Sequence, residues 1–240
     1  MSLNLAALTV DAHDPRTLAE FWAAILRRDV TAADDGILVL APNAANEFAI
    51  EFAPSDEPKR GPNQLHFDLT SQTPQDQQRI VERALALGAR HLDIGQGPEA
   101  PHVVLADPED NEFCVIEAGN AFLENTGVIG ALAGDGTRAV GHFWSAALGW
   151  PLVWDQDQET AIQSPAGGTK ITWGGPPVAP KLGKNRFHLD VAPPADGDQQ
   201  TEVERLLALG ARHVDIGQGD VPWVVLADPD GNEFCVLTPR

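Results

Sequence analysis

The amino-acid sequence predicts an α+β protein built from four βαβββ modules, which are arranged as two tandem domains. The first observation behind this prediction is an internal repeat. The segment GARHLDIGQG from Gly88 returns as GARHVDIGQG from Gly210, 122 residues later. The same spacing separates His66 from His188 and Trp22 from Trp144. The repeat therefore predicts two domains, at residues 1–120 and 125–240.

The second observation is the order of hydrophobic patterns inside each repeat. QLHFDLT alternates as a strand, with Leu65, Phe67 and Leu69 on one face. Thr73 and Pro74 then provide an N-cap and a first-turn proline for a helix that ends at Gly88. Three short strands follow, at 90–94, 102–106 and 111–116. This segment therefore predicts one βαβββ module.

The remaining segments repeat this order. A strand over 4–11 leads into a helix over 15–26, and the strand candidates after it end at EFAIEFA. The second half is expected to repeat both modules from about Thr126 and Lys184. Four modules fill the chain and leave no room for a further domain.

Composition excludes several classes of partner. The formal net charge is −19, which disfavours binding to nucleic acid or to anionic membranes. No run of 18 apolar residues is present, and the N-terminal segment reads as a strand instead of a signal peptide. Cys114 and Cys235 occupy matching places in the repeat, so we expect free thiols in a cytoplasmic protein. A monomer or a homodimer that binds a small molecule fits these properties.

The module order, the FW pairs in two helices, the LHFDL and FHLDV strands and the DPDGNEF turn resemble the vicinal oxygen chelate superfamily. This superfamily includes glyoxalase I, extradiol dioxygenases and bleomycin resistance proteins. The resemblance covers essentially the whole chain and is closest to bacterial glyoxalase-like domains. It implies that paired modules curl their sheets around a cleft. In the metal enzymes of the family, four side chains from first and last strands hold a divalent metal there.

Carried over by position, the resemblance implies an incomplete ligand set. The first-strand positions fall near Leu5 and Gly127, which have no metal-binding side chain. Glu51, His66 and Cys114 fall at the other three positions of the first half. This set suits zinc best because it contains a thiolate. The resemblance thus suggests a metal-dependent lyase or isomerase as one hypothesis, with glyoxalase I and extradiol dioxygenase activity disfavoured.

Several alternatives stay open at this point. In some relatives the cleft forms between modules of different subunits, so Glu51 could instead face His188 and Cys235. Each His–Cys pair could also provide a nucleophile. A structural interpretation is that Asp68 and Asp190 simply satisfy the two imidazoles.

The second half has more aromatic strands than the first. Trp223 stands where the first half has His102, and Trp173 stands at or beside the place of Glu51. Trp22 and Trp144 are expected in the core. The favoured hypothesis is a binding protein that takes a small apolar or aromatic molecule without a complete metal centre. Its ligand-binding residues would be Trp173, Trp223, His188, Asp190 and Cys235, and no catalytic residue is assigned.

Overall fold

The computed structural model describes residues 2–97 and 99–240, and within them it contains four α-helices and two eight-stranded mixed sheets. The helices are α1 (Pro15–Leu26), α2 (Pro74–Ala86), α3 (Arg138–Leu148) and α4 (Gln199–Ala208). Two short 3-10 turns are added at η1 (Asp34–Gly36) and η2 (Ala121–Leu123). The α+β class and the four βαβββ modules predicted from the sequence are confirmed.

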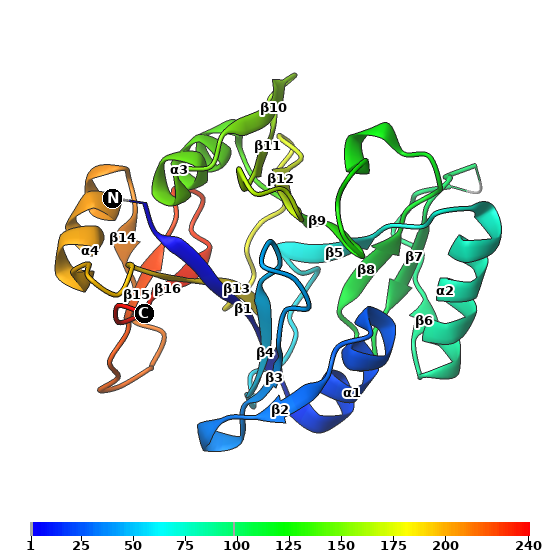
Figure 1. Cartoon of the computed structure of the whole chain (residues 1–240), viewed down its shortest axis with the longest axis horizontal. Coiled ribbons are helices and arrows are strands. Elements are labelled where there is room, and N and C mark those ends of the chain that lie inside the picture. Colours follow the sequence, from blue (N-terminus) through cyan, green and yellow to red (C-terminus); the bar gives the residue numbers. More distant parts are fainter. Residues whose placement is uncertain (1, 98) are drawn as a thin grey trace.

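One sheet, sheet A, joins the first module to the fourth. Its centre is the antiparallel pair of β1 (Asn4–Ala12) and β13 (Phe187–Ala192). Figure 1 shows the blue strands of the first module beside the orange and red strands of the last. The full order is β14 (Arg212–His213), β15 (Val224–Ala227), β16 (Glu233–Val236), β13, β1, β4 (Ala49–Pro54), β3 (Leu38–Leu40) and β2 (Val30–Ala32).

The other sheet, sheet B, joins the second module to the third. At its centre, β5 (Leu65–Leu69) pairs antiparallel with β9 (Ile129–Gly134). The full order is β10 (Leu152–Gln156), β11 (Glu159–Gln163), β12 (Lys170–Trp173), β9, β5, β8 (Glu112–Val115), β7 (Val103–Ala106) and β6 (Arg90–His91). The strand expected over 90–94 is shorter, since β6 ends at His91 and a bend at residues 94–95 follows.

The repeat and the sheets divide the chain differently. The sequence indicates tandem halves at 1–120 and 125–240. Each sheet, however, contains four strands from the first half and four from the second. Every face of a sheet is therefore built by both repeats. This pairing decides which candidate site residues meet.

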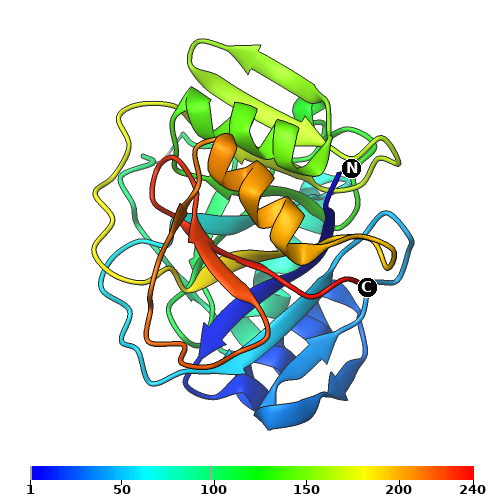
Figure 2. The same ribbon diagram turned by 90° about the vertical axis from the view of Figure 1, so that its left-hand side faces the viewer.

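Local sequence signals fix the helix ends as expected. The Thr73 hydroxyl accepts the backbone N–H of Asp76, and Pro74 opens α2. The Asp14 and Asp198 side chains cap α1 and α4 in the same way. Figure 2 shows α4 beside α3, where the Arg205 guanidinium donates to two α3 carbonyls at 3.0 and 2.8 Å. None of the helices in the described part of the chain combines the length and apolarity needed to cross a bilayer.

The core is shared between the two sheets through two tryptophans. Trp22 of α1 is fully buried and packs on Phe67 and Phe113 of sheet B, with ring centroids 4.7 and 5.1 Å away. Trp144 of α3 packs in the same manner on Phe234 of sheet A, at 4.9 Å. The prediction that both tryptophans belong to the core is confirmed. Each odd-numbered helix therefore fastens one sheet to the other.

Two buried carboxylates complete this arrangement. Asp107 accepts the Trp22 indole N–H at 3.0 Å, and Asp228 accepts that of Trp144 at 3.3 Å. Both lie in the DPEDN and DPDGN turns, whose backbone N–H groups and asparagine amides they also accept. Burial outweighs these donors and raises the pKa of each carboxyl to about 6.

We expect these two carboxyls to make stability depend on pH between about 4 and 6. In the unfolded chain each titrates near 3.8, so the folded protein holds the proton more tightly. Their contribution to stability is therefore fully present below the unfolded pKa and is lost as pH rises through 6. Urea unfolding at several pH values should show this loss, and a variant carrying Asp107→Asn and Asp228→Asn should lack it. Carboxyl NMR titrations with both midpoints near 4 would contradict the prediction.

Candidate functional site

Strand alternation presents the candidate residues on the face of each sheet opposite the buried core, called the site face below. On β5, Leu65, Phe67 and Leu69 are buried in the core while His66 and Asp68 point the other way. Asp68 pairs with Cys114 on β8, and Asp190 pairs with Cys235 on β16. Two triads result, and within each the donor atoms lie within 4.8 Å of one another. The sheet B triad is His66, Asp68 and Cys114, and the sheet A triad is His188, Asp190 and Cys235.

The triad of sheet A is internally satisfied. His188 Nδ1 lies 2.8 Å from Asp190 Oδ1 and 3.9 Å from Cys235 Sγ. The Thr9 hydroxyl donates to Asp190 Oδ2 at 2.8 Å. The histidine side chain is only 12% exposed. Every oxygen of the carboxylate thus has a partner inside the protein.

The triad of sheet B is looser and lacks one partner. His66 Nε2 lies 3.4 Å from Asp68 Oδ1, and the histidine side chain is 31% exposed. Asp68 Oδ1 is enclosed and makes no hydrogen bond within the described residues. In sheet A the oxygen that faces the histidine, Asp190 Oδ1, is hydrogen-bonded to His188, and Thr9 donates to the other oxygen. Thr9 pairs with His188 in the register of sheet A, whereas Ala133 pairs with His66 in sheet B. A methyl group therefore stands where sheet A has a hydroxyl donor.

Both histidines are favoured as imidazolium ions. Burial disfavours the charged ring, but the Asp68 carboxylate and the Cys114 sulfur outweigh it and raise the pKa of His66 to about 10. Asp190 and Cys235 raise the pKa of His188 well above its usual value in the same way. Each triad can therefore donate a charge-assisted hydrogen bond to an oxygen acceptor.

Glu51 belongs to the sheet A site. Ile50 and Phe52 are fully buried, so Glu51 points to the site face as expected. In the register of the sheet, Thr9 lies between Glu51 on β4 and His188 on β13. Burial, together with the charge of Asp190, raises the pKa of Glu51. The expectation that Glu51 joins His66 and Cys114 is wrong, because those residues lie in sheet B. Glu51 shares sheet A with His188 and Cys235, as in the alternative, but the side chains whose donor atoms converge there are His188, Asp190 and Cys235.

Register also corrects the first-strand positions. Ala7 pairs with Asp190 and Ala131 pairs with Asp68, so methyl groups face the two triads there. Leu5 lies beyond this point along β1, and Gly127 precedes β9. Ala7 and Ala131, which take the positions expected for Leu5 and Gly127, also have no side chain that can bind a metal.

Trp173 lies on the opposite face from the one expected. It is 3% exposed in the core and lines a small cavity there with Trp144 and Phe187. Thr172 takes the place of Glu51, since it pairs with Ala133 as Glu51 pairs with Thr9. The one-residue step along a strand turns the indole away from the site face. Trp173 therefore does not reach the His188 triad.

Trp223 immediately precedes β15 and is 37% exposed. Two residues further on, Val225 pairs with Cys235. Trp223 is therefore a surface residue at the rim of the sheet A site.

The thiols are free and buried, as predicted. Burial raises the pKa of the Cys235 thiol, and Asp190 adds to this effect against the opposing influence of His188. A protonated thiol is a poor nucleophile. The geometry therefore disfavours the nucleophilic hypothesis for Cys235.

The segment between the two halves covers part of the sheet B site, which the sequence did not indicate. Leu123 of η2 packs with Cys114, Ile116 and Ala131 in a small apolar cluster. Beside this cluster lies a cavity of about 610 Å³, which is lined by residues 70–72, 116–117, 119–121 and 123–126. Thr70 and Ile116 follow Asp68 and Cys114 by two residues, immediately after β5 and β8 end. The cavity therefore begins two residues beyond Asp68 and Cys114 along the chain.

Comparisons with known proteins agree with this architecture. The sequence model of the glyoxalase-like domain family matches residues 7–116 and 131–237. Glyoxalase I from Zea mays superposes with a TM-score of 0.67 at 14% identity, over 99% of this chain and 92% of that one. A putative dioxygenase from Bacillus subtilis superposes with a TM-score of 0.64 at 13% identity, over 100% of this chain and 87% of that one. No curated protein sequence matches the chain.

Proposed function

We propose, because this chain belongs to the glyoxalase-like domain family, that it binds a small molecule on the site face of sheet B. The observation that carries this proposal is the enclosed Asp68 Oδ1, which has no hydrogen-bond partner among the described residues. A buried carboxylate oxygen without a donor is costly, and a bound ligand relieves that cost. Both oxygens of the equivalent carboxylate in sheet A have partners, Asp190 Oδ1 in His188 and Asp190 Oδ2 in Thr9.

The geometry favours a ligand with two neighbouring oxygens. The His66 imidazolium donates a hydrogen bond, while Asp68 Oδ1, 3.4 Å away, accepts one. An α-hydroxy acid or α-hydroxy ketone presents an acceptor and a donor at a matching spacing. An apolar or aromatic remainder would lie against Leu123 and Ile116, in a cavity whose 610 Å³ is within the usual range of small-molecule sites.

A direct test compares mandelate, which has the hydroxyl and carboxylate next to a ring, with phenylacetate, which lacks the hydroxyl. Calorimetric titration should show mandelate binding tighter by roughly 10- to 100-fold, the value of one hydrogen bond to a charged group. His66→Gln should weaken mandelate binding by about tenfold or more. Ala133→Thr should also weaken it, because the new hydroxyl would occupy Asp68.

His188→Gln is the matched control, since His188 is the same residue in the other triad. It should leave mandelate affinity unchanged. If His188→Gln or Trp223→Ala removes binding and His66→Gln does not, the ligand binds sheet A, as the earlier hypothesis had it. Equal affinity for both acids, unchanged by Ala133→Thr, would refute the role given to Asp68.

A second candidate is a zinc site made by His66, Asp68 and Cys114. Their nitrogen, oxygen and sulfur donors suit zinc, and a tetrahedral zinc ion separates its nitrogen and oxygen ligands by about 3.4 Å. The His66–Asp68 separation has this value, whereas His188 and Asp190 lie 2.8 Å apart, at hydrogen-bond distance. The unpartnered Asp68 oxygen also fits a ligand role. Bound zinc would supply Lewis-acid chemistry for a lyase or isomerase, and His66, Asp68 and Cys114 would hold it.

A further inference from the structure

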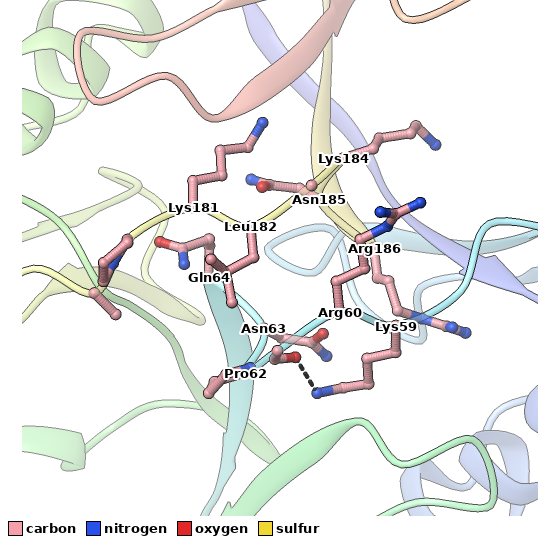
Figure 3. A pocket seen from close by; sticks show the side chains of 14 residues that line it. Lys59, Arg60, Pro62, Asn63, Gln64, Lys181, Leu182, Lys184, Asn185 and Arg186 are labelled. Atoms are coloured by element: carbon pink, nitrogen blue, oxygen red, sulfur yellow. Dashed lines mark hydrogen bonds between the residues drawn. The ribbon is translucent and has the colours of Figure 1, made fainter.

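A cavity lined by basic residues lies between the two segments that connect the modules within each half. These segments, 59–64 and 179–186, run between the sheets, and Figure 3 shows the side chains that line the cavity. The chain has 16 lysines and arginines against 35 acidic residues. None of the 14 residues that line this cavity is acidic. Five of the 16 basic residues line it: Lys59, Arg60, Lys181, Lys184 and Arg186.

Part of this charge has a structural role that both segments share. Lys59 pairs with Glu112 at 2.7 Å, and Lys181 pairs with Glu233 at the equivalent place. The backbone N–H of Asn63 and that of Asn185 donate to the same two glutamates at 3.1 Å. This repeated clamp holds each connecting segment to the last strand of its module.

The other three cations break the repeat. At the spacing of 122 residues, Arg60 matches Leu182, Lys184 matches Pro62 and Arg186 matches Gln64. The clamp does not need them, since each segment keeps its own clamp without the matching cation. Lys184 and Arg186 form ion pairs of their own, with Asp11 and Glu109, and these pairs use only part of their donors.

The three non-repeated cations retain donors that the protein does not use. Arg186 is 7% exposed and donates to the Asp11 carbonyl and to Glu109, yet its Nε is enclosed without a hydrogen-bond partner in the described residues. Lys184 uses one N–H on Asp11 and has two more. Arg60 makes no ion pair with any residue that the structure describes.

The two segments touch closely, which fixes the cavity. A Cβ on Gly61 would lie 3.0 Å from Leu182, and one on Gly183 would lie 3.1 Å from the Arg60 Cδ. The stem of Arg60 therefore rests on the opposite segment. The enclosed space is about 40 Å³, enough for about three water-sized groups. This volume matches the oxygens of one anionic group and is too small for an organic ring.

We propose that this cavity binds an oxyanion, the carboxylate or phosphate group of a small molecule, through Arg60, Lys184 and Arg186. Arginine suits this role because its planar donors match both groups. The site is separate from the sheet B triad and does not depend on it.

The test uses inorganic phosphate, titrated into the full chain at constant ionic strength and followed by calorimetry and by thermal unfolding. Saturable binding in the millimolar range is expected. Arg60→Gln should weaken it by roughly fivefold, the loss of a charge-assisted contact, and Arg186→Gln, which copies Gln64, should weaken it at least as much. Arg60 is exposed, so its variant should fold even if the Arg186 variant does not.

Arg79→Gln is the matched control, because Arg79 is an exposed arginine on α2 that pairs only with Asp76. The Arg79→Gln variant should bind phosphate as the parent does. His66→Gln should do so as well, and this result would show that phosphate binding is independent of the small-molecule site proposed at His66. Competition by acetate would indicate a site that accepts carboxylates, and its absence a site for phosphate alone. A response to phosphate that does not saturate, or equal affinities for Arg60→Gln and Arg79→Gln, would overturn the proposal.

Discussion

Replacing Trp22 with alanine is expected to lower the free energy of unfolding by about 3–5 kcal/mol. The indole is fully buried between α1 and sheet B, where it contacts the rings of Phe67 and Phe113. Its removal leaves a large cavity at the point where one sheet is fastened to the other. It also takes away the indole N–H that Asp107 accepts at 3.0 Å. Urea unfolding followed by circular dichroism measures the change.

Two variants separate packing from hydrogen bonding. Trp22→Phe keeps much of the ring contact and loses the N–H, so it should cost about 1–3 kcal/mol. Trp144→Ala, the equivalent change in the second half, should cost nearly as much as Trp22→Ala, because its indole packs on Phe234 in the same manner. A loss below about 1 kcal/mol for Trp22→Ala would show that the sheets do not depend on this contact.

The elements of the fold could be predicted because they depend on local sequence. The Thr73 and Pro74 start of α2, the core role of Trp22 and Trp144, and the alternation that exposes His66 are all short-range properties. The internal repeat then doubled each observation. Free cysteines at matching strand positions followed from the same repeat.

The pairing of modules could not be predicted in this way. Leu8 and Val10 show the same alternation whether β1 pairs with β5 or with β13. The actual partner, β13, lies some 180 residues away in the chain, and nothing in either strand marks the other. The neighbours of Glu51 depended on this choice, so the sequence left two alternatives open and only the fold decides between them.

Trp173 shows a different limit. Its position relative to Glu51 depends on small length differences in the loops of the two halves, which sequence matching resolved only to within one residue. A shift of one residue changes the face of a strand. The structure places Thr172 opposite Ala133 and therefore sends the indole of Trp173 into the core.

The surroundings of the two triads differ at one matched position of the repeat. Thr9 donates to Asp190 Oδ2, whereas Ala133 offers no hydroxyl to Asp68. The oxygen that faces the histidine is hydrogen-bonded in Asp190 and is not in Asp68. The two sites thus share histidine, aspartate and cysteine, but within the described residues the unpaired carboxylate oxygen is found in the sheet B site alone. The duplication provides an internal control for each experiment at that site.

The zinc hypothesis makes the second prediction with a large effect. If His66, Asp68 and Cys114 hold zinc, protein purified without a histidine tag should bind one zinc ion per chain. Cys114→Ser should weaken this binding by roughly 100-fold or more, because it removes one of three protein ligands. Calorimetry measures the affinity. Cobalt substitution gives a second readout, since a thiolate–cobalt charge-transfer band should be present in the parent and absent in Cys114→Ser.

Cys235→Ser is the matched control and should leave both the affinity and the cobalt band nearly unchanged, since His188 and Asp190 are already hydrogen-bonded to each other. Ala133→Thr should weaken zinc binding, because its hydroxyl would compete for Asp68 Oδ1. A band that survives Cys114→Ser and disappears in Cys235→Ser would place the metal in sheet A, where Glu51 lies close to the triad. No stoichiometric metal in the parent would remove the metal-dependent lyase or isomerase hypothesis and leave the mandelate experiment to decide small-molecule binding at His66.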